Sequence, residues 1–257
     1  LFVAMVAGFL GSFLLIRNLA LIGDGLAHVS FGAIAIGLVV GIVDALYWAF
    51  AICVIAAILI NYLQVKQWLT GDTAIAIFLT GMLGLGIVVT RIWGGGSLIS
   101  VEGYLWGNLN LIDSDSFDFI MVSCFLSYLS LAALYQSLLL ISIDPIAARI
   151  QGLPVRFIGL YWSILTAAVV VSMVQFVGVL LVTALIVTPA AIAQLISRSF
   201  LMCVIYSQLI GIITVLLGLY YSAELSTDSG AMIALVSAMM FVVVAILYKS
   251  IVVHGYT

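Results

Sequence analysis

Asp24 and His28 are the two residues whose types and spacing are best suited to chemistry. They lie four positions apart in an apolar stretch, so on a helix both side chains project from one face. A carboxylate oxygen and a neutral imidazole nitrogen both bind a borderline divalent cation such as Zn²⁺. The pair predicts a metal site that needs further ligands, because a closed site usually has four.

A second copy of the chain would supply the missing ligands. If a two-fold axis passes beside this helix face, two Asp24 and two His28 side chains meet and form a set that accepts Zn²⁺ or Mn²⁺. In the alternative interpretation, Asp24 caps a helix that begins after Gly23, and His28 makes a hydrogen bond inside a helical bundle. The spacing alone leaves both open.

The composition predicts an all-α, polytopic transmembrane bundle. Hydrophobic residues make up 66% of the 257 residues and charged residues 7%, with a mean hydropathy of +1.42. Only helices with internally satisfied backbones carry so much apolar sequence through a bilayer, so a soluble fold is excluded. The net charge of −3 leaves no basic surface for nucleic acid. Three single cysteines are interpreted as packing residues: Cys53, Cys124 and Cys203.

Nine apolar segments are long enough to be candidate spans, and together they form a single transmembrane domain over residues 1–257. The sixth and seventh meet at residues 175–178 with little loop between them, so eight spans is the alternative count. The segments are 1–16, 25–43, 46–63, 73–93, 118–141, 156–175, 177–196, 201–221 and 230–248.

Basic residues predict the orientation, because cytoplasmic loops carry an excess of Lys and Arg. If residues 142–156 are cytoplasmic, nine alternating spans leave only Arg91 of the seven basic residues outside. The N-terminus then lies outside and the C-terminus in the cytoplasm. The residues on or near the inside are Arg17, Lys66, Arg149, Arg156, Arg198 and Lys249.

Two loops are candidate contact surfaces. In residues 142–156, Asp144 can cap a short helix, Pro145 can take its first position and Gly152 can end it. Such a helix suits contact with a soluble partner, and an ordinary membrane-surface loop is the alternative. Residues 94–117, rich in glycine and aromatic residues, are expected on the outer face, as a docking loop or as an aromatic interface loop.

Pro189 interrupts the seventh segment. It removes one backbone donor and frees the carbonyl of Leu185, which predicts a helix bend beside Thr183 and Thr188. Lining of a pathway by these threonines and Pro189 is the less favoured interpretation, because Thr often bonds to its own helix.

The sequence contains none of three motifs for hydrolytic chemistry: G-x-x-x-x-G-K-[ST], H-E-x-x-H and G-x-S-x-G. We therefore expect that the chain is not an enzyme and does not hydrolyse ATP itself.

The order of several segments resembles the zinc/manganese/iron permeases of ATP-binding-cassette importers. The resemblance covers nearly the whole chain. It is carried by residues 10–37 (LGSFLLIRNLALIGDGLAHVSFGAIAIG), 71–77 (GDTAIAI), 104–109 (YLWGNL), 144–147 (DPIA) followed by Gly152, and 178–191 (GVLLVTALIVTPAA).

The resemblance implies a homodimeric permease in the plasma membrane, surrounded by lipid, with Asp24 and His28 as the metal site in the translocation path. No cofactor is bound permanently, because the metal is the transported ion. A cytoplasmic ATP-binding subunit and an extracytoplasmic metal-binding protein are the expected partners. The ATPase is expected at the loop that contains Asp144, Pro145, Ala148, Arg149 and Gly152.

The cargo is expected to be Zn²⁺, with Mn²⁺ next. Manganese-type members tend to carry a proline shortly after the histidine, whereas Val29-Ser30-Phe31-Gly32-Ala33 follows His28. The alternative function is a stand-alone ion-coupled carrier or channel, for which Asp24 and Asp72 are the candidate coupling acids.

Overall fold

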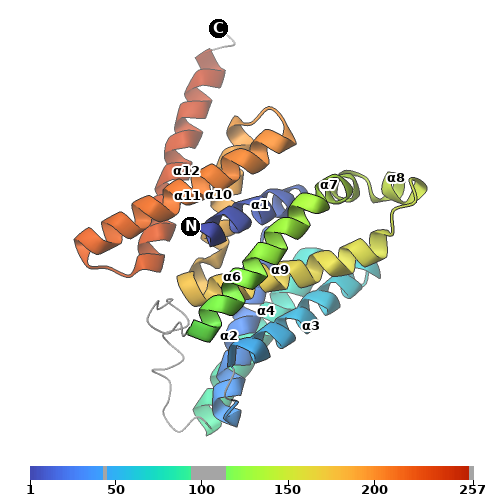
Figure 1. Ribbon diagram of the computed structural model, residues 1–257, viewed down its shortest axis with the longest axis vertical. Helices are drawn as coiled ribbons and strands as arrows, with labels where there is room; N and C mark the ends of the chain where they lie inside the picture. Colours follow the sequence, from blue (N-terminus) through green and yellow to red (C-terminus); the bar gives the residue numbers. More distant parts are fainter. Residues whose placement is uncertain (43–44, 94–113, 255–257) are drawn as a thin grey trace. The chain divides into compact units, whose positions relative to one another are not determined.

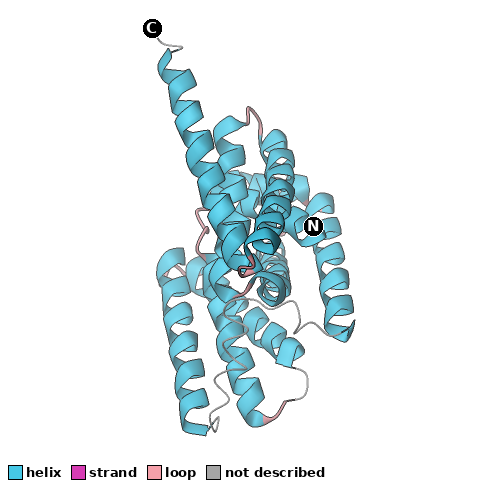
Figure 2. Cartoon of the chain, turned by 90° about the vertical axis from the view of Figure 1, so that its left-hand side faces the viewer, coloured by secondary structure: helices cyan, strands magenta, loops and turns pink. Residues whose placement is uncertain are grey.

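Helices form every regular element that the computed structural model describes, which covers residues 1–42, 45–93 and 114–254 (Figure 2). A helix lies on each of the nine apolar segments, as the sequence predicts. The elements are α1 (Phe2–Ile16), α2 (Ile22–Val40), α3 (Ala45–Val65), α4 (Gly71–Trp93), α6 (Ser114–Ala133), α7 (Tyr135–Ile143), α8 (Pro145–Ile150), α9 (Val155–Val177), the 3₁₀ turn η2 (Val179–Leu181), α10 (Val182–Ile196), α11 (Phe200–Leu225) and α12 (Ser229–His254).

Six of the described helices are long and apolar enough to cross a membrane, and a bent pair, α6 with α7, would make a seventh. The shorter apolar helices α1 and α10 have 15 residues each and extend about 22 Å, less than the roughly 30 Å of a hydrocarbon core. The expected count of eight or nine spans is therefore not confirmed by helix length.

The fifth predicted span differs from the expectation of one straight helix over residues 118–141. The helix begins earlier, at Ser114, and α6 and α7 meet at Leu134 with a bend of 68°. Neither glycine nor proline lies at this break, so the residue pattern carries no signal for it.

Residues 21–182 form one of two compact units, with α2 packed against α3, α4, α9 and η2 (Figure 1). Glycines let α2 and α4 approach closely. A Cβ at Gly32 would collide with the carbonyl oxygen of Met82, and one at Gly86 would lie 2.9 Å from the Cα of Gly32. Small residues at helix contacts are typical of membrane bundles, where close backbone approach provides much of the attraction.

Residues 1–20 and 183–257 form the other unit, which contains α1, α10, α11 and α12. Here α1 packs against α11, and the Ser207 hydroxyl donates a 2.8 Å hydrogen bond to the Gly8 carbonyl. A Cβ at Gly8 would lie 2.7 Å from the carbonyl oxygen of Ser207, so this contact also depends on a missing side chain.

Candidate metal site

Helix α2 carries both predicted metal ligands. Its N-cap is Leu21, and no side chain caps the helix by a hydrogen bond. Asp24 lies within the first turn, three residues beyond this N-cap. The alternative in which Asp24 caps the helix is therefore wrong. A carboxylate in the first turn is still favoured by the positive end of the helix dipole.

The pair has the spacing of two ligands rather than of a bonded pair. Asp24 Oδ1 and His28 Nε2 lie 3.7 Å apart. This separation exceeds that of a hydrogen bond, in which heavy atoms lie about 2.7–3.2 Å apart. Two atoms each about 2.1 Å from one tetrahedral ion would lie about 3.4 Å apart. A small movement would let one ion bridge the two atoms.

The Asp24 and His28 side chains are partly exposed on one side of α2. The His28 side chain is 11% exposed and the Asp24 side chain 30%, although the residues around them on α2 are buried. The other imidazole nitrogen, His28 Nδ1, is buried and has no hydrogen-bond partner among the described residues. A buried nitrogen without a partner is costly, and it marks a histidine whose surroundings are incomplete among the residues that the structure describes.

The described part of the chain supplies two strong ligands at this place and no more. Among residues 1–42, 45–93 and 114–254, no group of three or more His, Cys, Asp and Glu side chains is arranged to hold a metal ion. Two ligands are too few for a closed site, so any ion here needs donors from water, the backbone or another copy.

Neighbouring helices hold the ligand-bearing turn in place. Gly25 faces α4, where a Cβ on it would lie 2.5 Å from Ile75 Cγ2. From α3, the buried Cys53 thiol donates a hydrogen bond of 3.4 Å to the Leu26 carbonyl. Cys53 is thus a packing residue, as the sequence predicts, and it contacts the turn between the two ligands.

The loop that follows α7 contains the short helix predicted from its sequence. The Asp144 carboxylate accepts hydrogen bonds from the backbone N–H groups of Ile146 (2.8 Å) and Ala147 (2.9 Å), and Pro145 takes the first helical position. An aspartate cap before proline is a strong helix start.

Gly152 ends this helix, as expected. It adopts φ +83°, and its N–H donates to Arg149 O while the N–H of Leu153 donates to Ala148 O. This is the Schellman arrangement, which requires a left-handed residue and so favours glycine.

Ala148 is fully buried, although the sequence places it among the residues expected to contact the ATPase. The exposed residues of α8 are Pro145, Ile146, Arg149 and Ile150, with Ile146 at 69% and Ile150 at 82%. Burial of Ala148 follows from the helix periodicity, because α8 packs against α7 and α9 on that side.

Thr183, Thr188 and Pro189 lie on α10, in the unit of residues 1–20 and 183–257, whereas Asp24 and His28 belong to residues 21–182. Pro189 is buried inside an uninterrupted helix and packs near Gly211 of α11. The Thr183 hydroxyl is buried without a hydrogen-bond partner among the described residues. Lining of a pathway by these residues stays a prediction.

The predicted outer loop, residues 94–117, lies largely outside the described residues, which resume at Ser114 with α6. Its proposed contact with a partner stays a prediction.

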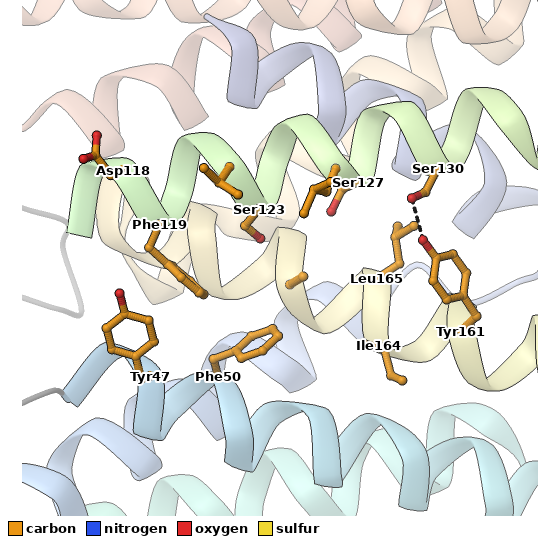
Figure 3. Close-up of a pocket in the computed structure, with 13 residues that line it drawn as sticks. Tyr47, Phe50, Asp118, Phe119, Ser123, Ser127, Ser130, Tyr161, Ile164 and Leu165 are labelled. Atoms are coloured by element: carbon orange, nitrogen blue, oxygen red, sulfur yellow. Dashed lines mark hydrogen bonds between the residues drawn. The ribbon is translucent and has the colours of Figure 1, made fainter. Parts of the chain in front are cut away.

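A cavity of about 570 Å³ between α3, α6 and α9 was not predicted from the sequence (Figure 3). Ser123, Ser127 and Ser130 of α6 line it, and the Tyr161 hydroxyl of α9 donates a hydrogen bond to Ser130. The three serines recur at helical spacing within residues 114–133, which is the sequence signal for a hydroxyl-bearing face.

Comparison with known proteins decides the family. The model of the ABC 3 transport family matches residues 1–248. The chain belongs to the ABC 3 transport family. As a member of this family it is a multi-pass membrane permease subunit, and ATP hydrolysis belongs to a separate subunit.

Two similar proteins carry manganese in their names. The chain is 30% identical over 239 residues to the manganese transport system membrane protein MntC of Listeria innocua, covering 93% of this chain and 84% of MntC. It is 31% identical over 242 residues to the manganese import system permease protein ScaB of Streptococcus gordonii, covering 94% and 86%. The expectation of zinc from the residues after His28 gains no support from these names.

A solved structure has a similar fold. The structure described as PsaBC from Streptococcus pneumoniae in complex with Fab matches with a TM-score of 0.81 and 28% sequence identity, covering 95% of this chain and 87% of that one. The two chains thus share a fold over almost the entire length of this one.

Proposed function

We propose that this permease subunit imports a divalent transition metal, with Mn²⁺ as the favoured ion, and that the ion passes a site made by Asp24 and His28 of two copies. The observation that carries this proposal is the open Asp24–His28 pair, 3.7 Å apart on an otherwise buried helix. An acid and an imidazole are costly inside a bilayer, and a metal pathway gives a reason for both.

Manganese stands before zinc because the similar proteins MntC and ScaB are named for manganese transport. The ligand chemistry agrees with either ion, since carboxylate suits Mn²⁺ and imidazole suits several transition metals. Selection between these ions then depends partly on the extracytoplasmic metal-binding protein that delivers them.

The second copy completes the ligand set. Two Asp24 carboxylates and two His28 imidazoles around one axis provide four donors and two negative charges, which balance a dication in a low-dielectric surrounding. In the proposed topology, each copy crosses the membrane with all nine apolar segments, and its N-terminus lies outside and its C-terminus in the cytoplasm.

The helix α8 serves as the contact for the ATP-binding subunit. It is preorganised by the Asp144 cap and the Gly152 terminus, and it exposes Ile146, Arg149 and Ile150 to a partner. A rigid element with exposed apolar side chains can pass a movement of the ATPase to the membrane helices.

A stand-alone carrier is not favoured. Its second coupling acid, Asp72, lies exposed in the first turn of α4, where a carboxylate needs no functional explanation.

Transport into proteoliposomes tests the proposal. The chain reconstituted with its ATP-binding subunit and supplied with the metal-binding protein should accumulate Mn²⁺ only when ATP is supplied, with Zn²⁺ and Fe²⁺ measured in parallel as competitors. Accumulation that is driven by an ion gradient, without the ATP-binding subunit, would contradict the proposal.

A further inference from the structure

A second cavity, of about 390 Å³, is lined by positively charged side chains. It lies where the C-terminal end of α3 and the start of α9 run side by side (Figure 1), and Lys66, Arg149 and Arg156 line it. These are three of only seven basic residues in the chain. No acidic residue lines the cavity among the residues that the structure describes.

The three cations have no carboxylate partner in the described part of the chain. Among the described residues, none of them lies within 4.0 Å of an Asp or Glu oxygen. Lys66 Nζ instead lies 5.8 Å from the centre of the Tyr62 ring, which also lines the cavity. Unbalanced positive charge in a concave site attracts an anion, because the low-dielectric walls strengthen the field.

The rest of the lining is largely apolar. Ile58, Val65 and Leu160 provide hydrocarbon surface, and Asn61 adds one amide. The cavity therefore fits a molecule that has both an anionic group and an apolar part. Inorganic phosphate would use the cations and leave the apolar wall in contact with water.

The position of the cavity matches the edge of a bilayer. The membrane-length helix of α3 ends at Val65, and that of α9 begins at Val155. Next to this end lie two exposed aromatic side chains, Tyr62 and Trp68, whose rings meet edge to face. Tyr and Trp beside a lysine at a helix end are typical of the headgroup level of a membrane.

We propose that this cavity binds an anionic phospholipid, with the phosphate held by Lys66, Arg149 and Arg156 and the start of an acyl chain against Ile58, Val65 and Leu160. The bound lipid joins the end of α3 to the start of α9, directly after the short helix α8. This site is separate from Asp24 and His28 and does not depend on which metal is carried, and it shares only Arg149 with the proposed contact of α8 for the ATP-binding subunit.

Native mass spectrometry of the permease in complex with its ATP-binding subunit tests this site. Phosphatidylglycerol and phosphatidylcholine with identical chains are titrated in turn, and the wild-type complex should retain the anionic lipid preferentially. The double variant Lys66→Gln/Arg156→Gln should bind phosphatidylglycerol about 25-fold more weakly, about fivefold for each charge removed. The matched control, Arg91→Gln/Lys249→Gln, removes two exposed basic residues elsewhere and should bind as the wild type does.

Three results would overturn the proposal. One is equal retention of phosphatidylglycerol by the double variant and the control, with melting temperatures that show both to be folded. Another is displacement of the lipid by inorganic phosphate at a concentration at which phosphate itself binds, which would indicate a free-anion site. The third is preference for phosphatidylglycerol in the permease alone that disappears in the complex, which would assign the cavity to a protein surface.

Discussion

Asp24 and His28 are the residues on which transport is expected to depend. Asp24→Asn keeps the shape of the side chain and removes the charge that offsets a dication. His28→Ala removes the imidazole ligand. Loss of a supporting partner of a metal ligand already costs about 10–100-fold, so loss of a ligand itself should lower metal uptake at least that much. Uptake by proteoliposomes, with the amount of folded protein measured in each sample, checks this.

Asp72→Asn is the matched control, because Asp72 is another helix-start carboxylate on a membrane-length helix. It should leave uptake near the wild-type rate. If Asp72→Asn abolished uptake and Asp24→Asn did not, the assignment of the metal site to Asp24 and His28 would be wrong.

The sequence predicted the ligand pair because an acid and a histidine at helical spacing stand out in apolar sequence. It did not predict that Ala148 is buried or that Ile150 is exposed, because both are apolar residues of one short helix. Their difference arises from packing against other helices. Nor did it predict the orphan Nδ1 of His28, which depends on neighbours distant in the chain.

The stability of the protein is expected to depend on the close approach of α2 and α4. Gly32→Ala places a methyl group against the Met82 carbonyl, whereas Gly81→Ala on α4 meets nothing within 4 Å. Both changes gain similarly in helix propensity, so their difference reports the contact. The free energy of unfolding of Gly32→Ala should be lower than that of Gly81→Ala by about 1–3 kcal/mol.

Thermal unfolding in detergent measures this difference, and Gly32→Ala should melt several degrees below Gly81→Ala. Equal melting temperatures would mean that α2 and α4 are not held by this contact.

Two substitutions in α8 should distinguish a residue that contacts the ATP-binding subunit from a residue that packs inside the permease. Ile150→Glu changes an exposed side chain and should reduce stimulation of the ATPase by at least about fivefold, the effect of losing an interface anchor worth more than 1 kcal/mol, without lowering the melting temperature. Ala148→Leu inserts volume at a buried position and should lower the melting temperature.

ATPase rates and melting curves of the two variants check this separation. A stable Ile150→Glu variant with normal ATP-coupled transport would remove α8 from the contact with the ATP-binding subunit.

The positions of the nine helical segments could be predicted from apolar runs, because each run is long and bounded by polar residues. The bend at Leu134 could not be predicted, since no glycine or proline marks it. Helices α1 and α10 have 15 residues each, so helix length alone does not give the number of spans. The division at residues 182 and 183 likewise has no mark in composition.

The proposed metal site requires two copies of the chain, because the described residues of one copy offer two strong ligands. Crosslinking measures this requirement directly. Asp24→Cys is introduced into a chain whose native cysteines, Cys53, Cys124 and Cys203, are replaced, and the membrane-embedded transporter is treated with a short thiol-bridging reagent. Asp24 is the better position because its side chain is 30% exposed. We expect a covalent dimer that forms through this position and is prevented by prior alkylation. If the protein stays monomeric while the cysteine reacts readily with a small maleimide, each chain keeps its own Asp24–His28 pair and the paired metal site is contradicted.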